Sequence, residues 1–386
     1  TVQRRDLAAM TQTRTYLDYN ATAPLRPDAR TAMIAALDLK GNASSVHAEG
    51  REARQVIEAA RADVARLVGA RAADVVFTSG ATEANAWVAA GGWRRIYLSG
   101  LEHDSVRAPA AASGAEIVQL PVKSEGVIDV AAVAALLADA QPLADGRALM
   151  CVQAANNETG VIQPVAELAA LARAYGIAVQ SDAVQAAGRI ALDCAVLGID
   201  FLSISAHKIG GPKGMGALVL RDGAALKPLV RGGGQERGRR GGTENVAAIA
   251  GFGAAARAAL NDLELQSAIA ARRDGLASAL RAQTPELVVI GAGADRLANT
   301  LCVALPGHAA ETLVIRLDLA GVAISAGSAC SSGKVGVSAT LAAMKLPDEI
   351  AKGAVRLSLG SDTTDDDIRR AVNAWRDSTV GARRAA

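Results

Sequence analysis

Lys208 is the residue whose position most strongly suggests chemistry. It follows residues 201–205, which are expected to form a buried strand, and precedes a glycine-rich turn. A lysine at the end of a buried strand is costly unless its charge is paired, its pKa is depressed or its amine is used covalently. Taken alone, a lysine that reaches the surface is the commoner case.

Two further features favour chemistry over that simpler interpretation. Asp182 ends another short strand-like run, and residues 79–85 (SGATEAN) form a turn that opens a helix. The free N–H groups and the dipole at the start of a helix suit an anion such as phosphate. A lysine amine, a strand-end carboxylate and a phosphate-type turn are together the parts of a pyridoxal 5'-phosphate site.

A sheet is needed to bring these residues together. Seven short strand-like runs, most of them separated by helix-length segments, lie at residues 75–78, 96–99, 116–120, 149–152, 178–181, 201–205 and 217–220. The alternation predicts an α/β fold with a mostly parallel sheet that helices cover on both faces. Such sheets bind ligands beyond the carboxyl ends of their strands, where polar groups follow several of these runs.

The pattern changes beyond residue 220. A Gly/Arg-rich stretch at residues 231–242 precedes an Ala-rich helical region up to about Leu280, and further strands are expected at residues 287–290, 300–303 and 355–358. We expect a large cofactor-binding domain over residues 15–255. A smaller α+β domain would comprise residues 256–386 together with the N-terminal segment 1–14.

Composition excludes several classes of protein. Of the 386 residues, 51% are hydrophobic and 21% are charged, which is typical of a globular protein, and only 3% are aromatic. The net charge of +2 supplies no broad basic field, so we expect no nucleic-acid partner. The longest apolar or glycine run, residues 246–256, is short of the roughly 20 residues that cross a bilayer, so no membrane contact is expected.

The N-terminal segment and the cysteines indicate a cytoplasmic protein. Residues 1–14 are polar and charged, without the apolar block of a secretory signal. Cys151, Cys194, Cys302 and Cys330 are widely spaced and form no C-x-x-C pair, so we expect free thiols and neither a zinc site nor another stably bound metal.

Nine segments, in order, carry a resemblance to a known family. They are residues 16–22, 77–85, 102–103, 156–164, Asp182 with Gln185, 205–216, 232–245, 327–333 and 356–360. With them the chain resembles the cysteine desulfurases, which are fold-type I pyridoxal-phosphate enzymes grouped with the class V aminotransferases. The resemblance covers nearly the whole chain.

The resemblance implies how the cofactor is held. Lys208 would bind it covalently and then carry the Cα proton, Asp182 would keep the ring nitrogen protonated, and Gln185 would donate to the phenolic oxygen. His103 would stack on the ring and could handle a substrate proton, although an isolated histidine in a loop is more often structural.

The phosphate and the substrate have further predicted ligands. The resemblance assigns the phosphate to Ala81, Thr82, Ser205 and His207, completed by Thr243 of the partner subunit in a homodimer.

Arg356 is the expected clamp for the substrate carboxylate, because a guanidinium offers two parallel donors. Asn156 would assist it and would also contact the cofactor. Without this context, a surface ion pair would be the more common role for Arg356.

Cys330 decides the predicted reaction. It lies in the Gly/Ser-rich segment 325–333, whose composition favours mobility and partial exposure, whereas the other three cysteines are expected to be inert core residues. Its thiolate would attack the sulfur of substrate L-cysteine, which would leave L-alanine and a persulfide on Cys330. A long loop through Ser338 resembles that of family members that deliver sulfur to an iron–sulfur scaffold protein, so a transient contact of Cys330 with a nascent cluster is also expected.

Some positions depart from the family pattern, and two rival functions stay open. Ala23 and Ala43 stand where Thr and Pro are common, and residues 338–341 (SATL) replace a Ser-His-Val-Leu run, which bears on the partner that the loop meets. One rival is another enzyme on the same scaffold, such as a selenocysteine lyase or an aminotransferase. The other is a non-catalytic binding protein that kept the fold.

Overall fold

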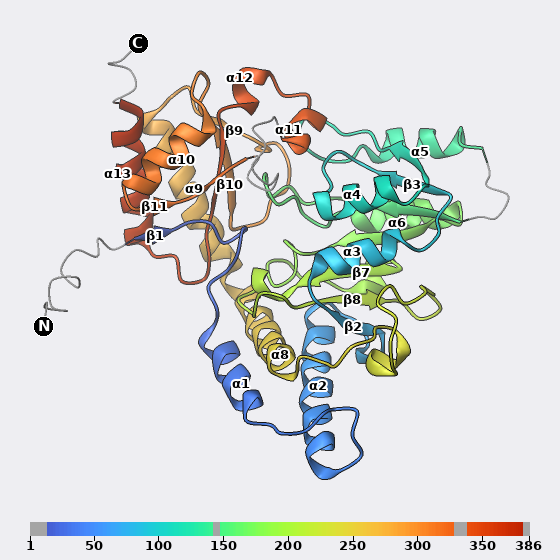
Figure 1. Ribbon diagram of the computed structural model, residues 1–386. Coiled ribbons are helices and arrows are strands. Elements are labelled where there is room, and N and C mark those ends of the chain that lie inside the picture. The colour runs from blue at the N-terminus through green and yellow to red at the C-terminus, as the bar shows by residue number, and fades with distance from the viewer. Residues whose placement is uncertain (1–13, 142–146, 328–337, 381–386) are drawn as a thin grey trace, which may run out of the picture.

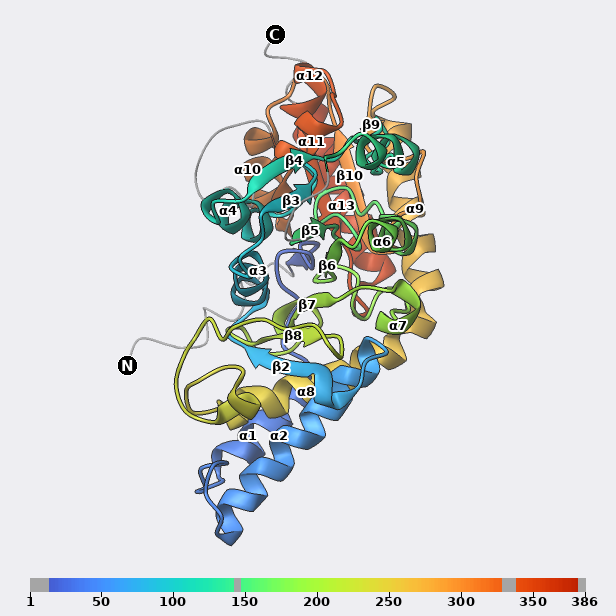
Figure 2. The same cartoon turned by 90° about the vertical axis from the view of Figure 1, so that its right-hand side faces the viewer.

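A seven-stranded sheet forms the centre of the computed structural model, which describes residues 14–141, 147–327 and 338–380 (Figure 1). Its strands follow one another in the order β2 (Val75–Thr78), β8 (Gly216–Leu220), β7 (Phe201–Ser205), β6 (Ala178–Asp182), β5 (Ala148–Cys151), β3 (Arg95–Leu98) and β4 (Glu116–Gln119). Neighbours are parallel except β8, which is antiparallel to both β2 and β7. Each predicted strand is found within one residue of its expected ends, so the mostly parallel α/β sheet is confirmed, and Figure 2 shows the strands one above another.

Helices cover both faces of this sheet, because successive residues of a strand point to opposite sides. Val75 and Phe77 of β2 belong to one hydrophobic cluster, whereas Val76 between them belongs to another. The covering helices are α3 (Ala81–Ala89), α4 (Asp104–Ala112), α5 (Val130–Ala138), α6 (Val165–Ala174) and the short α7 (Cys194–Leu197). Both clusters are built mainly on aliphatic side chains, as the low aromatic content requires.

Three helices pack closely beside β2 at the lower end of the view in Figure 1: α1 (Pro27–Leu37), α2 (Ala48–Leu67) and α8 (Val246–Asn261). Small residues of α8 permit the approach. A Cβ at Gly251 would lie 2.5 Å from Met33 of α1, and one at Gly253 would lie 2.6 Å from Ala60 of α2. The predicted Ala-rich helical region consists of two helices, α8 and α9 (Gln266–Gln283), with a 3-10 turn at Asp262–Leu265 between them.

The C-terminal part has its own sheet and core. Its antiparallel strands follow the order β12 (Ser325–Ala326), β13 (Ala354–Ser358), β10 (Thr300–Ala304) and β9 (Val288–Val289). Helices α9, α10 (Ala310–Leu319) and α13 (Asp365–Val380) accompany this sheet, and α11 (Ala339–Ala343) and α12 (Asp348–Ala351) are short. The second core includes Leu276, Leu301, Val355 and Trp375. The expected α+β character is present, and the domain boundary near residue 255 stays a prediction.

The first described residues cross between the two parts. β1 (Thr15–Tyr16) pairs in parallel with β11 (Val322–Ala323), and Leu17 belongs to the C-terminal core. The Ser358 N–H donates to Leu17 O at 2.7 Å. The chain then runs through Asn20 toward the C-terminal edge of the large sheet. None of the described helices combines the length and the apolar character that a membrane crossing requires.

Candidate active site

A cavity of about 370 Å³ lies beyond the carboxyl ends of β2, β6 and β7. It is lined by predicted site residues from four separate segments of the chain: Ala81 and Thr82 after β2, His103 after β3, Asp182 and Gln185 at the end of β6, and Ser205, His207 and Lys208 at the end of β7. These residues meet because parallel strands place their carboxyl ends at one edge.

Lys208 stands in a 3-10 turn, Ala206–Lys208, that begins directly after β7. Its Nζ donates to Ala21 O at 2.9 Å and also to Asn20 O. Burial, together with the charges of Lys208 and Lys213, lowers the pKa of the neighbouring His207 to about 4. His207 is therefore a neutral ring at physiological pH.

The Asp182 carboxylate is buried and accepts two hydrogen bonds from the protein. Its Oδ2 accepts from Asn85 Nδ2 at 3.0 Å, and its Oδ1 accepts from the Val184 N–H at 3.0 Å. Asn85 is itself fully buried on α3, and its Oδ1 accepts from Gln180 Nε2 and Ser203 Oγ at 2.7 and 2.6 Å. The acid is thus held in one orientation at the cavity wall.

The start of α3 offers donors to an anion. Gly80 is the N-cap residue, and no side chain of the described residues caps the first N–H groups of this helix. A Cβ added at Gly80 would meet nothing within 4 Å, so the space in front of the helix is open. Uncapped N–H groups beside Ser205, a ring acid at Asp182 and a lysine amine together fit the predicted cofactor, which has a phosphate, a protonated ring nitrogen and an aldehyde that reacts with amines.

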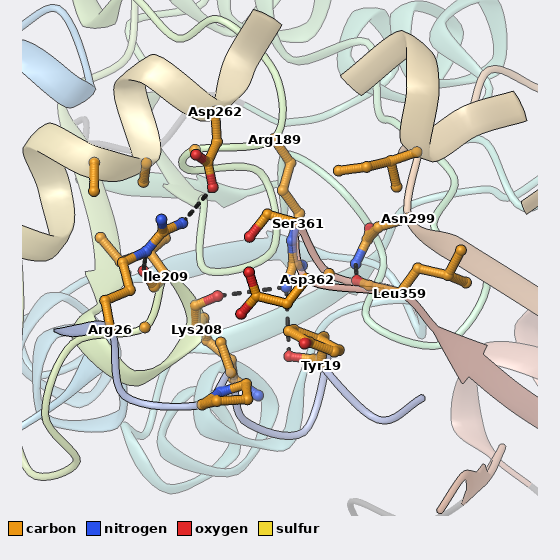
Figure 3. Close-up of a pocket in the computed structure, with 18 of the residues that line it drawn as sticks. Tyr19, Arg26, Arg189, Lys208, Ile209, Asp262, Asn299, Leu359, Ser361 and Asp362 are labelled. Carbon is orange, nitrogen blue, oxygen red and sulfur yellow. Dashed lines mark hydrogen bonds and ion pairs between the residues drawn. The ribbon is translucent and has the colours of Figure 1, made fainter. Parts of the chain in front are cut away.

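Arg189 is a buried residue of this region that the sequence analysis missed. It lines a second cavity, of about 250 Å³, and Figure 3 shows it between Tyr19 and Lys208, whose carbonyl oxygens accept from its Nη2 at 3.5 Å. Its Nη1 donates to the Oε1 of Gln185, whose Nε2 donates to Asn20 O at 3.0 Å. Burial and the charge of Arg356 lower the pKa of Arg189 to about 9. The available signal was a lone charge in the apolar run at residues 183–192.

Arg356 and Asn156 lie behind the cavity wall. Arg356 is 1% exposed on β13, donates from Nη1 to Asn157 O at 2.9 Å, and pairs with Asp18 at 2.8 Å. Its Nε is buried and has no partner among the described residues. The alternative of a surface ion pair is therefore wrong for Arg356. Asn157, which accepts from it, does line the cavity.

Asn156 is fully buried and belongs to the turn that also holds Asn157. Its Nδ2 donates to Leu101 O and Thr340 Oγ1, both at 3.2 Å, while its Oδ1 accepts from the N–H groups of Glu158 and Thr159. The structure therefore gives Asn156 a part in ordering this turn, and it does not line the cavity.

The cavity is not lined by Thr243, another of the predicted site residues. Thr243 lines a separate cavity with Phe77 and Glu236. Ser79 and Gly214 line both this cavity and the one that contains Lys208. Cys330 is outside the described residues. The first described residue after it, Ser338, is the N-cap residue of α11 and donates to Glu158 Oε2 at 2.6 Å.

Burial raises the pKa of Glu158 to about 7. The described part of the chain holds no group of three or more His, Cys, Asp or Glu side chains arranged for a metal ion. Cys151, Cys194 and Cys302 are free thiols.

Comparisons with known proteins agree with this arrangement. The family model described as aminotransferase class-V matches residues 15–371. A cysteine desulfurase of Cereibacter sphaeroides is 42% identical over 369 residues, which are 92% of this chain and 93% of that protein. An IscS-like cysteine desulfurase of Mycobacterium tuberculosis is 38% identical over 387 residues, which are 96% of this chain and 98% of that protein.

A solved structure extends the likeness to three dimensions. The NifS-like protein from Rickettsia africae matches with a TM-score of 0.88 and 32% identity, and the match covers 95% of this chain and 99% of that one. The extent of these matches leaves one conclusion: the chain belongs to the class-V aminotransferase family.

Proposed function

We propose that this protein is a cysteine desulfurase that converts L-cysteine to L-alanine with pyridoxal 5'-phosphate and collects the sulfur on Cys330. One observation carries the proposal: the Lys208 amine, the buried Asp182 carboxylate and the uncapped start of α3 border a single cavity. Relatives over nearly the whole chain are named cysteine desulfurases, which supports the same assignment.

Each cavity residue then has a task. When bound, the cofactor supplies an electron sink that makes the Cβ–S bond of the substrate breakable. Lys208 provides the amine for attachment and later carries the Cα proton. Asp182, held by Asn85, keeps a proton on the ring nitrogen. Gln185 accepts from Arg189 and donates one Nε2 hydrogen to Asn20 O, and the second Nε2 hydrogen would go to the ring oxygen.

The phosphate and the substrate would be held by the remaining residues. Ala81 and Thr82 offer backbone N–H groups, and Ser205 and His207 stand beside them. Thr243 would complete the phosphate site of the partner subunit in a homodimer. Arg356, whose buried Nε has no partner in the described part of the chain, would hold the substrate carboxylate with the help of Asn156.

Sulfur transfer needs a thiolate that reaches the substrate. The Cys330 thiolate attacks the substrate sulfur, an S–S bond forms and the Cβ–S bond breaks, and protonation of the carbon leaves alanine. The persulfide would then pass to an iron–sulfur scaffold protein in the cytoplasm.

Mass spectrometry after addition of cysteine tests this step. The wild-type protein should gain one sulfur atom on Cys330 and release alanine, whereas Cys330→Ala should lose both. Cys194→Ala is the matched control, because it removes a half-buried thiol outside the cavity and should keep both. Undiminished alanine formation by Cys330→Ala would contradict the persulfide mechanism.

The rivals are separated by two further measurements. Transfer of the amino group to a keto acid at a rate above that of desulfuration would indicate an aminotransferase, and selective release of selenium would indicate a selenocysteine lyase. A non-catalytic protein would lack the absorbance band of lysine-bound cofactor, or would keep it in Lys208→Ala. We also expect Asp182→Ala to retain more cofactor binding than turnover, because the phosphate contacts remain.

A further inference from the structure

A chain of hydrogen bonds joins Asp182 to His103, and both residues line the cavity. Asp182 Oδ2 lies 3.0 Å from Asn85 Nδ2, which also lies 2.9 Å from Ser105 Oγ. Ser105 Oγ in turn lies 2.9 Å from His103 Nδ1. The chain joins residues of β6, α3 and α4 with the loop before α4, so it depends on the packed fold.

An ionised Asp182 fixes the direction of the first link in this chain. A carboxylate only accepts hydrogen bonds, so the NH2 group of Asn85 must face it. This orientation leaves Asn85 Oδ1 for the donors Gln180 Nε2 and Ser203 Oγ, and both are present. The second hydrogen of the NH2 group goes to Ser105 Oγ. That oxygen therefore accepts from Asn85 with one lone pair, and its single hydrogen is available to His103 Nδ1.

A second donor reaches the same nitrogen of the ring. His103 is the N-cap residue of α4, and its Nδ1 also accepts from the Ser105 backbone N–H at 3.1 Å. The positive end of the helix dipole lies at this position. A nitrogen that accepts from this N–H carries no proton of its own, so the Ser105 hydroxyl must donate to it and the proton of the neutral ring must be on Nε2.

We propose that Ser105, aligned by Asn85, is a positioning residue that holds His103 as a neutral ring with its proton on Nε2. The inference deepens the proposed function, on which it rests for the ligand that the ring meets. His103 presents a donor to that ligand and no lone pair. Removal of the substrate Cα proton therefore belongs to Lys208, and His103 stacks and donates a hydrogen bond.

The charges around the ring are of both signs. Lys208 lines the same cavity and opposes a second proton on His103, whereas Glu158 favours one. Asp104 and Arg107 follow on α4 and are bonded to each other, which reduces the net charge there. The buried Glu102 precedes the ring, and burial raises the pKa of its carboxyl well above the ordinary range, which opposes a negative charge there. Among the described residues, the hydrogen bonds at Nδ1 act on one nitrogen of the ring and so favour one tautomer.

Nitrogen NMR of the cofactor-loaded protein, labelled with ¹⁵N in histidine, tests the proposal. The chain has four histidines, and loss of one signal in His103→Gln assigns the ring. In the wild type, two-bond proton–nitrogen correlations should show Nδ1 unprotonated and Nε2 protonated. A wild-type ring with its proton on Nδ1 would overturn the proposal.

Ser105→Ala removes one donor to Nδ1 and keeps the backbone N–H. Because a hydrogen bond contributes about 0.5–1.5 kcal/mol, ring protonation should become about 2- to 12-fold more favourable, seen as a move of its titration midpoint to higher pH. Ser105→Thr keeps the hydroxyl and should restore the wild-type midpoint.

Ser113→Ala is the matched control. This serine follows the last turn of α4, and its hydroxyl donates to Ala110 O at 2.7 Å, so its loss should leave His103 unchanged. An unchanged midpoint in Ser105→Ala would overturn the proposal. The NMR signals report on the His103 ring directly and do not depend on turnover. If they show the expected tautomer while the persulfide assay fails, only the proposed function is rejected.

Discussion

The Arg61–Glu236 ion pair allows a stability prediction to be worked out from the structure. Glu236 Oε2 and Oε1 accept from the Arg61 guanidinium at 2.6 and 2.9 Å, and the two side chains are 4% and 3% exposed. The pair also covers β2, an edge strand of the large sheet: Glu236 accepts from the Phe77 N–H at 2.9 Å, and Arg61 donates to Val75 O at 3.0 Å.

Glu236→Gln removes the charge that compensates buried Arg61. Breaking a buried pair from one side costs about 3–5 kcal/mol. Unfolding entropy of about 2.1 cal/mol/K per residue gives about 0.8 kcal/mol/K for a chain of this length, so the melting temperature should fall by about 4–6 °C. Glu236 and Arg237 have φ of 47° and 60°, a conformation that is strained for these residues. Without the ion pair to Arg61, this turn before Thr243 should be less firmly held.

The assay is thermal unfolding of the cofactor-loaded protein, followed by circular dichroism at one fixed concentration. Glu58→Gln is the control, because Glu58 also bonds to Arg61, at 3.1 Å, but is 45% exposed and should contribute less than about 1 kcal/mol. If Glu236→Gln melts no lower than Glu58→Gln, the ion pair does not stabilise this edge as we argue.

Three further changes have expected outcomes. The pKa of Glu158 is raised to about 7 from its ordinary 4.5, so the folded protein binds the carboxyl proton more tightly than the unfolded chain does. The contribution of this proton to the free energy of unfolding is therefore full below about pH 4.5 and is lost as pH rises through about 7. Glu158→Gln should therefore gain about 2–4 kcal/mol on the wild type between about pH 5 and pH 8, measured by urea unfolding, and a constant difference would contradict this. Gly360→Ala places a Cβ 1.9 Å from the Tyr19 ring and should cost about 1–3 kcal/mol in the same assay, unless Tyr19 moves freely. Trp375→Ala leaves a cavity where the side chain is 1% exposed and should lower the free energy of unfolding by about 3–5 kcal/mol. Trp375→Phe should lose mainly the hydrogen bond to Thr284, so equal losses in the two variants would show that packing of Trp375 is not the source of its stabilisation.

The large sheet was predictable because its strands carry a strong local signal. Runs such as residues 201–205 are buried at every position, and a buried parallel sheet needs continuous apolar stretches. The rule that ligands bind at the carboxyl ends then placed Asp182 and Lys208 at one cavity without any knowledge of side-chain positions.

Side-chain partners that come from different elements were not predictable. Asn85 ends the SGATEAN segment at residues 79–85, yet its contacts with Asp182 and Ser105 arise only when β6, α3 and α4 pack together. Arg189 gives no local sign that its guanidinium faces backbone carbonyls. The left-handed backbone at Glu236 was also not predictable, because Asn or Gly is the usual occupant of that conformation.

The pairing of β1 with β11 has a consequence for biosynthesis. Residues 15–16 leave the ribosome more than three hundred residues before their partners at 322–323. Contacts this distant along the chain slow folding, because a long loop must close before they form. The nascent strand β1 therefore lacks its β11 partner until more than three hundred further residues have been made.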